Sequence, residues 1–158
     1  MAYAVINTDL MSATKNASKH VSFKIVSTAV ENGNVLSIGS LADGERQVYQ
    51  YSTPAVNTAL TSIAILVTPE LVADERKKAL SDFRNEVGDI ALGFMLEKGD
   101  VFTVTAEALT GTSIAVGNIV ELQAGTKLKV VSSLTSGSTK VGSVIAIENG
   151  KYRIRVSD

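Results

Sequence analysis

A two-residue turn near the end of the chain constrains the fold more than any other feature of the sequence. Asn149-Gly150 stands between residues 144–148 and 151–156, two runs rich in alternating apolar and polar residues. A tight hairpin turn needs a positive φ at both of its central positions, which Asn and Gly adopt readily. Such a turn predicts three cross-strand pairs: Glu148 with Lys151, Ile147 with Tyr152, and Ile145 with Ile154. It also predicts that Arg153 and Arg155 lie on the opposite face of this hairpin.

Other segments predict further strands. Residues 21–30 alternate apolar and polar side chains, but the alternation shifts by one position near Ile25 and Val26. A one-residue shift exchanges the two faces of a strand, so we predict a β-bulge there. Asn32-Gly33 then predicts a second hairpin turn, with a return strand over residues 34–38. Residues 63–67, IAILV, form a continuous apolar run that fits a strand buried on both faces or a short buried helix segment, and its length favours the strand.

One segment predicts a helix. Thr68-Pro69-Glu70 combines a hydroxyl N-cap, a proline and an acidic residue near the positive end of the helix dipole. Apolar residues then recur at helical spacing: Leu80, Phe83, Val87, Ile90 and Phe94. Because Gly88 and Gly93 both disfavour a helix interior, we predict a short amphipathic helix over residues 70–86 that ends before Gly88.

Together these patterns predict a mainly β fold, a compact barrel or sandwich-like domain with one short helix and an N-terminal arm. Branched β-carbons favour strands, and 44 of the 158 residues are Val, Ile or Thr. We divide the chain into an arm, residues 1–19, and one β-rich domain, residues 20–158, in which residues 98–158 could form a compact C-terminal β unit. The expected core side chains are Val21, Phe23, Ile25, Ile63, Ile65, Val67, Leu80, Phe83, Phe102, Val104, Ile145, Ile147, Tyr152 and Ile154.

The arm has an intermediate character. It is too apolar for a solvated tail and too irregular to build a core of its own. Its larger apolar side chains are Tyr3, Val5, Ile6, Leu10 and Met11. Such a segment is satisfied most simply by lying on its own domain, on a neighbouring subunit or on a larger assembly, and disorder is a further alternative. We take these five residues as possible assembly contacts.

The sequence contains no pattern of residues that indicates catalysis. There is no cysteine, and His20 is the single histidine, which is best explained as an exposed residue at a strand edge. Asp82, Glu86 and Asp89 would share one helix face, where a solvated surface is a better explanation than a Ca²⁺ site. Glycines of the C-terminal half fit turns and bulges and form no phosphate-binding loop: Gly117, Gly125, Gly142 and Gly150. We therefore expect no catalytic residues, no metal and no cofactor.

Charge and hydropathy restrict the partners. The formal net charge is −1, which argues against bulk electrostatic binding of nucleic acid or of an anionic membrane. The apolar run at residues 63–67 is far too short to span a bilayer. Two pairs of cations alternate along expected strands, Lys127 with Lys129 and Arg153 with Arg155. We interpret them as solvated, edge-protecting side chains or as a surface for an anionic partner.

Several segments carry a resemblance to a known family. They are residues 39–49 (GSLADGERQVY), 68–78 (TPELVADERKK), 98–105 (KGDVFTVT), 116–131 (VGNIVELQAGTKLKVV) and 141–156 (VGSVIAIENGKYRIRV). The chain resembles head decoration, or capsid-cement, proteins of tailed bacteriophages over most of residues 30–156. The resemblance implies a non-enzymatic virion protein made in the host cytoplasm. It implies binding to the major capsid protein on the capsid exterior and homo-oligomer formation on that lattice.

Two other classes of function stay open beside this one. One is a small β-barrel module that binds a carbohydrate, a peptide or a nucleic acid through the Lys127/Lys129 and Arg153/Arg155 faces. The other is a hydrolase, which the single histidine and the lack of a G-x-S-x-G motif make the weakest of the three.

Overall fold

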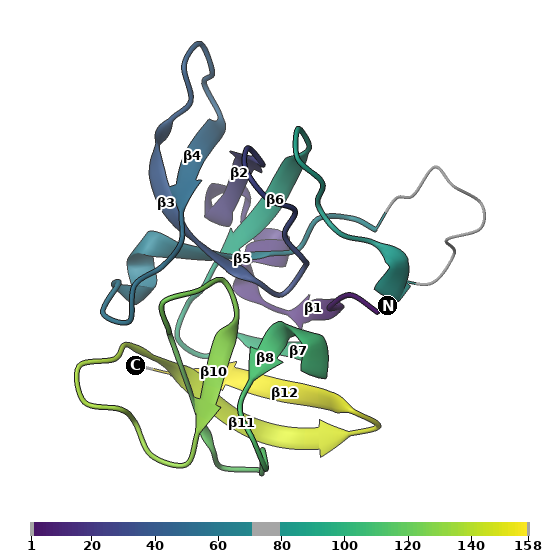
Figure 1. Ribbon diagram of the computed structural model, residues 1–158, viewed down its shortest axis with the longest axis vertical. Helices are drawn as coiled ribbons and strands as arrows, with labels where there is room; N and C mark the ends of the chain where they lie inside the picture. The colour runs from purple at the N-terminus through teal and green to yellow at the C-terminus, as the bar shows by residue number, and fades with distance from the viewer. Residues whose placement is uncertain (1, 71–79, 158) are drawn as a thin grey trace.

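The computed structural model describes residues 2–70 and 80–157, and within them the chain is mainly β, as the sequence predicts. Two β units make up the molecule (Figure 1): a closed barrel of five strands and a sheet of seven strands. Short 3-10 helices occur between strands: Ser12–Lys15, Ala17–Lys19, Leu60–Ser62, Leu80–Asp82 and Ala106–Ala108.

The barrel is formed by strands from the first two thirds of the chain. These are β2 (His20–Lys24), β3 (Val35–Leu41), β4 (Val48–Ser52), β5 (Ile63–Leu66) and β6 (Ile90–Met95). They pair in the order β2-β4-β3-β5-β6, and β6 closes the barrel by pairing antiparallel with β2. β2 and β4 pair in parallel, whereas the other neighbours are antiparallel. The hairpin of β3 and β4 extends away from the rest of the molecule (Figure 1).

The seven-stranded sheet combines the N-terminal strand with strands of the C-terminal part. Its members are β1 (Ile6–Leu10), β7 (Val101–Thr105), β8 (Leu109–Thr110), β9 (Ile119–Glu121), β10 (Leu128–Val131), β11 (Lys140–Glu148) and β12 (Lys151–Val156). Their order is β1-β7-β12-β11-β9-β10-β8, so β1 forms one edge of the sheet.

Strand β5 is buried on both faces, which confirms the prediction from its continuous apolar sequence. Ala64 and Leu66 belong to the core inside the barrel. Ile63 and Ile65 point the other way, into the core that the barrel shares with the larger sheet. Because successive side chains of a strand point to opposite faces, one strand serves two cores.

The prediction of a helix over residues 70–86 is wrong for residues 80–86, the part that the structure describes after Glu70. Residues 71–79 lie outside the described residues, and the chain resumes after them as a single 3-10 turn, Leu80–Asp82. Asn85 then forms an isolated antiparallel bridge to Val30, and the last two residues of the apolar stripe lie in β6. The apolar residues at helical spacing therefore do not form one buried helix face: Leu80 is 56% exposed, and Ile90 belongs to a strand. The expectation that the chain is not helical beyond Gly88 is confirmed.

Asn32-Gly33 forms a turn, but the hairpin expected there is absent. Gly33 has a φ of +85° and the amide of Asn34 donates to the carbonyl of Glu31, as in a β-turn. The flanking residues pair elsewhere, Val30 with Asn85 and Val35 with Ile65. The expected bulge at Ile25 is also wrong, because β2 ends at Lys24.

The hairpin at Asn149-Gly150 is confirmed. Both residues have a positive φ, 51° and 73°, and Glu148 pairs with Lys151 and Ile147 with Tyr152 as predicted. The third pair is wrong, because the register shifts between Val144 and Ala146.

The shift leaves Ile145 without a partner and places Val144 opposite Ile154 instead. Ile145 is consequently 41% exposed. Gly142 allows the close approach of β12 to β11, since a Cβ there would clash with the carbonyl oxygen of Arg155.

The core predictions divide into three groups by burial. Eight of the expected side chains are buried: Val21, Phe23, Ile25, Ile63, Ile65, Phe102, Val104 and Ile154. Four are half-buried: Val67, Phe83, Ile147 and Tyr152. Leu80 and Ile145 are exposed, because one lies in the 3-10 turn and the other at the register shift.

Candidate assembly surface

The N-terminal segment lies on its own chain, which is the first of the alternatives that its composition left open. β1 pairs antiparallel with β7, so that Ile6 lies opposite Val104 and Asn7 opposite Thr103. The amide of Thr105 donates to the carbonyl of Val5 at 3.1 Å. The segment therefore extends the sheet by one strand and is not a free arm in this structure.

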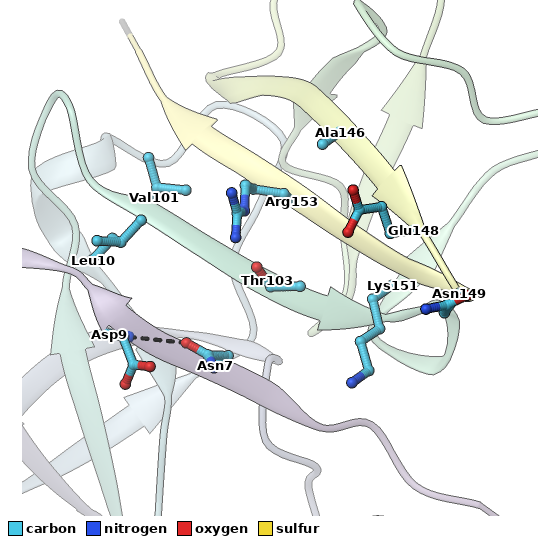
Figure 2. Close-up of a pocket in the computed structure, with 10 residues that line it drawn as sticks. All are labelled: Asn7, Asp9, Leu10, Val101, Thr103, Ala146, Glu148, Asn149, Lys151 and Arg153. Carbon is cyan, nitrogen blue, oxygen red and sulfur yellow. Dashed lines mark hydrogen bonds between the residues drawn. The ribbon is translucent and has the colours of Figure 1, made fainter.

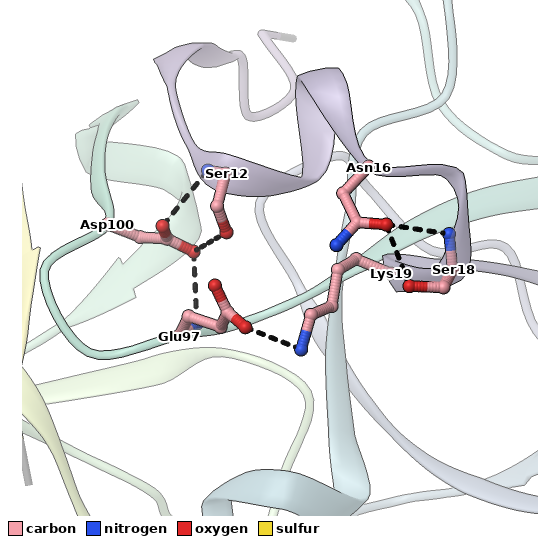
Figure 3. Close-up of polar contacts among 6 residues, drawn as sticks. All are labelled: Ser12, Asn16, Ser18, Lys19, Glu97 and Asp100. Carbon is pink, nitrogen blue, oxygen red and sulfur yellow. Dashed lines mark hydrogen bonds and ion pairs between the residues drawn. The ribbon is translucent and has the colours of Figure 1, made fainter.

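Polar contacts fix the segment that comes after β1 (Figure 3). The backbone amide of Ser12 donates to Oδ1 of Asp100 at 3.0 Å, and Oδ2 of Asp100 accepts from the amide of Glu97. Lys19 forms an ion pair with Glu97 at 2.6 Å. This hydrogen-bonded pair lowers the pKa of the Glu97 carboxyl, first through the bond from Lys19 and then through one from Ser12.

Burial divides the five residues that we took as possible assembly contacts. Met11 is only 2% exposed and packs in the core that the barrel shares with the sheet, so it cannot contact a partner. Tyr3, Val5 and Ile6 are half-buried. Leu10, at the end of β1, is 61% exposed and is therefore accessible to a partner.

A broad hollow of about 480 Å³ lies over the outer face of strands β1, β7, β12 and β11 (Figure 2). Its lining residues are Asn7, Asp9, Leu10, Val101, Thr103, Ala146, Glu148, Asn149, Lys151 and Arg153. We call this the sheet face, and we include the exposed Arg155, which alternates with Arg153 on β12. The sequence patterns indicated Leu10 and the two arginines, but the pairing that places Asn7 and Thr103 beside them could not be read from local patterns.

The two arginines lie on the exposed side of β12, as the hairpin pattern predicts. Both are exposed, whereas Ile154 between them is fully buried. Within the described residues, neither guanidinium group takes part in a hydrogen bond or ion pair. They are therefore available to an external anionic group.

The Lys127/Lys129 pair is less available. Lys129 lies 3.7 Å from the carboxylate of Glu121, which is itself 1% exposed. The same carboxylate accepts hydrogen bonds from the amide and the hydroxyl of Thr135. Lys127 is half-buried. Lys129 therefore helps to hold the sheet and the loop at Thr135 together, and the pair offers less of a cationic surface than the two arginines.

The three acidic residues expected on one helix face are separated by turns. Glu86 pairs with Arg84 at 2.6 Å, and this bond raises the pKa of the Arg84 guanidinium. Asp89 accepts from the amide of Glu86, and Asp82 lies in the 3-10 turn. Over residues 2–70 and 80–157, no three His, Asp or Glu side chains are grouped so as to hold a metal ion.

His20 begins β2 and is exposed, and its ring has two contacts. Nε2 donates to the carbonyl of Ala13 at 2.7 Å, and the ring stacks on Phe94 with centroids 4.8 Å apart. It borders a second hollow, of about 350 Å³, which residues of β2, β3, β4 and β6 help to line. The other lining residues are Ser18, Val21, Ile38, Tyr49, Thr61, Ser62 and Met95.

No family model matches the chain, and the comparison with curated proteins returns no relative. In the part of the chain that the structure describes, no helix combines the length and the apolar character needed to cross a membrane. The fold and the sheet face thus define a mainly β protein with an open, charged outer surface.

Proposed function

We propose that this chain is a non-enzymatic virion structural protein of a tailed bacteriophage, which binds the outer surface of the capsid and stabilises it. The observation that carries the proposal is the sheet face. It is broad, it includes the exposed Leu10, and it holds two exposed arginines without partners in the described residues. An open surface of this kind suits contact with another macromolecule more than enclosure of a small substrate.

The resemblance of the sequence to capsid-decoration proteins supports the same proposal. Two of the segments that carry it, residues 98–105 and 141–156, contain β7, β12 and all of β11 except its first residue. These strands supply most of the sheet face. The family resemblance and the candidate surface therefore coincide in the C-terminal part of the chain.

The stabilising effect would result from mass action. A protein that binds the assembled shell, and not its free subunits, shifts the equilibrium toward the shell. Each contact can be modest because a lattice presents many copies, and joined sites act with high effective concentration. Under this proposal the partner is the major capsid protein, the chain forms homo-oligomers on the lattice, and it is located on the capsid exterior after synthesis in the host cytoplasm.

Co-sedimentation tests the proposal directly. Purified capsids that lack this protein are mixed with the free chain and pelleted, while size-exclusion chromatography measures the mass of the free form. We expect the chain to pellet with capsids in a saturable, stoichiometric ratio and not with unassembled capsid protein. Equal recovery with and without capsids would contradict the proposal.

The second hollow favours the carbohydrate form of the alternative, a β-barrel binding module. Ser18, Thr61, Ser62 and Tyr49 are among the residues that line it. Hydroxyl donors beside an aromatic ring are groups that recognise a sugar. A glycan array tests this alternative with the free protein, in the absence of capsids. Binding of a glycan that Tyr49→Ala abolishes would favour this alternative over capsid decoration.

A further inference from the structure

We propose that Arg153 and Arg155 bind carboxylate groups of an acidic protein segment, and that this is the contact that holds the sheet face on its partner. The identity of the partner as a capsid surface rests on the proposed function. The requirement for carboxylates rests on the arrangement of the two arginines themselves.

The two guanidinium groups share one face of one strand. Arg153 and Arg155 are alternate residues of β12, so their side chains project on the same side, about 7 Å apart along the strand. The buried Ile154 between them anchors the strand to the core. Their spacing is therefore set by a strand that is paired on both sides, with β7 and with β11.

The residues directly opposite these arginines on the neighbouring strands are uncharged and short. Arg153 lies opposite Thr103 on β7 and Ala146 on β11, and Arg155 lies opposite Val101 and Ser143. Short neighbours leave the planar guanidinium fork open to a ligand from above the sheet. A guanidinium group can then bind a carboxylate through two parallel hydrogen bonds.

The carboxylates of the same face are placed at its borders. Glu148 lies opposite Lys151 next to the hairpin turn and forms no ion pair with Arg153. Asp9 belongs to the edge strand β1, and its side chain points away from Arg153 in Figure 2. The described residues thus supply no internal partner for either arginine, and an incoming carboxylate would meet two unpaired cations.

A protein partner fits this face better than a nucleic acid. The residues that line the hollow include no aromatic ring on which a base could stack. Tyr152, the aromatic residue of β12, packs against the core on the opposite side. Two arginines also give little phosphate neutralisation on a chain with a net charge of −1.

The test compares two double charge reversals. R153E/R155E changes the sheet face, and K24E/R46E makes the same change in net charge at exposed positions of the barrel unit. Neither Lys24 nor Arg46 forms an ion pair with a described residue. Melting temperatures of both variants are measured first, and if that of R153E/R155E falls, R153Q/R155Q and its matched control K24Q/R46Q replace the two reversals.

Capsid co-sedimentation gives the main result. We expect R153E/R155E to bind capsids at least about tenfold more weakly than the unchanged protein, and K24E/R46E to bind normally. Two results would overturn the proposal: normal binding by R153E/R155E, or equal weakening by both variants, which would indicate net charge alone.

A peptide titration keeps this inference separate from the proposed function. Hexaglutamate is added to the isotopically labelled protein at low salt, with hexaglutamine as the neutral control, and the arginine side-chain signals are monitored by NMR. Shifts of the Arg153 and Arg155 signals with hexaglutamate alone, abolished by added salt, support the carboxylate site even if capsids do not bind. If these signals do not move more than that of the exposed Arg46, the site is refuted although capsid binding could stand.

Discussion

The backbone amide of Ser12 donates to Oδ1 of Asp100 at 3.0 Å, and this hydrogen bond ties the N-terminal segment to the turn between the barrel and the larger sheet. The other carboxylate oxygen of Asp100 accepts from the Ser12 hydroxyl and from the amide of Glu97. Asp100 is almost completely buried, so its carboxylate joins segments that are 88 residues apart in the sequence.

Replacing this carboxylate should destabilise the protein strongly. Asp100→Ala leaves two backbone amides in a partly buried region without their acceptor, and we expect a loss of about 2–3 kcal/mol in the free energy of unfolding. Urea denaturation measures it. Asp43→Ala, in an exposed loop, is the control and should stay within about 0.5 kcal/mol. Similar values for the two variants would contradict the bridging role of Asp100.

Neighbouring residues at the end of β1 should differ sharply. Met11→Ala opens a cavity in the shared core, and we expect a cost of about 2–4 kcal/mol. Leu10→Ala removes a side chain that is 61% exposed and should cost less than about 0.5 kcal/mol. Differential scanning calorimetry of both variants checks this. An arm that did not dock on its own chain would give two equally stable variants.

Gly142 should tolerate no side chain. A Cβ at this position would overlap the carbonyl oxygen of Arg155, so Gly142→Ala must push β11 away from β12. We expect a loss of about 2 kcal/mol or more. Gly125→Ala is the matched control, because its Cβ would meet nothing nearer than Gln123 at 3.9 Å. Unfolding curves that superimpose for the two variants would show that β11 and β12 do not approach each other this closely at Gly142.

The Lys19–Glu97 pair should give a small dependence of stability on pH. Because the hydrogen bond from Lys19 lowers the pKa of Glu97 in the folded state, the pair stabilises the protein above the unfolded pKa of about 4.3. This contribution is lost as the pH falls through the lowered folded pKa. Glu97→Gln should thus be slightly less stable than the unchanged protein near neutral pH and equally stable in acid. A stability difference that does not change with pH, measured by urea denaturation, would contradict the ion pair.

The sequence predicts correctly those turns and strands that are determined by a few neighbouring residues. Asn149-Gly150 needs two positive φ angles, and residues 63–67 need burial on both faces; each requirement can be read from a few neighbouring residues. The pairing of β1 with β7 joins residues about 100 positions apart, and no local pattern reports it. The helical spacing from Leu80 to Phe94 was misleading. In the structure Leu80 lies in a 3-10 turn and Phe94 in strand β6, and residue spacing alone cannot separate this arrangement from one helix.

The sequence predicts which side of β12 carries the candidate surface, but it does not predict which residues surround the two arginines there. The alternation around Ile154 indicated that Arg153 and Arg155 share an exposed face. That Thr103 and Ala146 would surround Arg153 depends on which strands pair with β12, and one of these registers is set by the shift at Ile145. The burial of Met11 could not be predicted, because an isolated apolar residue in an irregular segment carries no sign of its surroundings.

Strand β5 has a consequence for how the molecule unfolds. Its side chains alternate between the barrel interior and the core shared with the larger sheet, so neither core can lose this strand without opening the other. The two β units are therefore coupled in a single cooperative transition, and a fragment that ends before β7 would expose Ile63 and Ile65 to water. Amide protons of β5 should consequently exchange at the rate of global unfolding, and separating the barrel from the sheet by cutting the chain would unfold both.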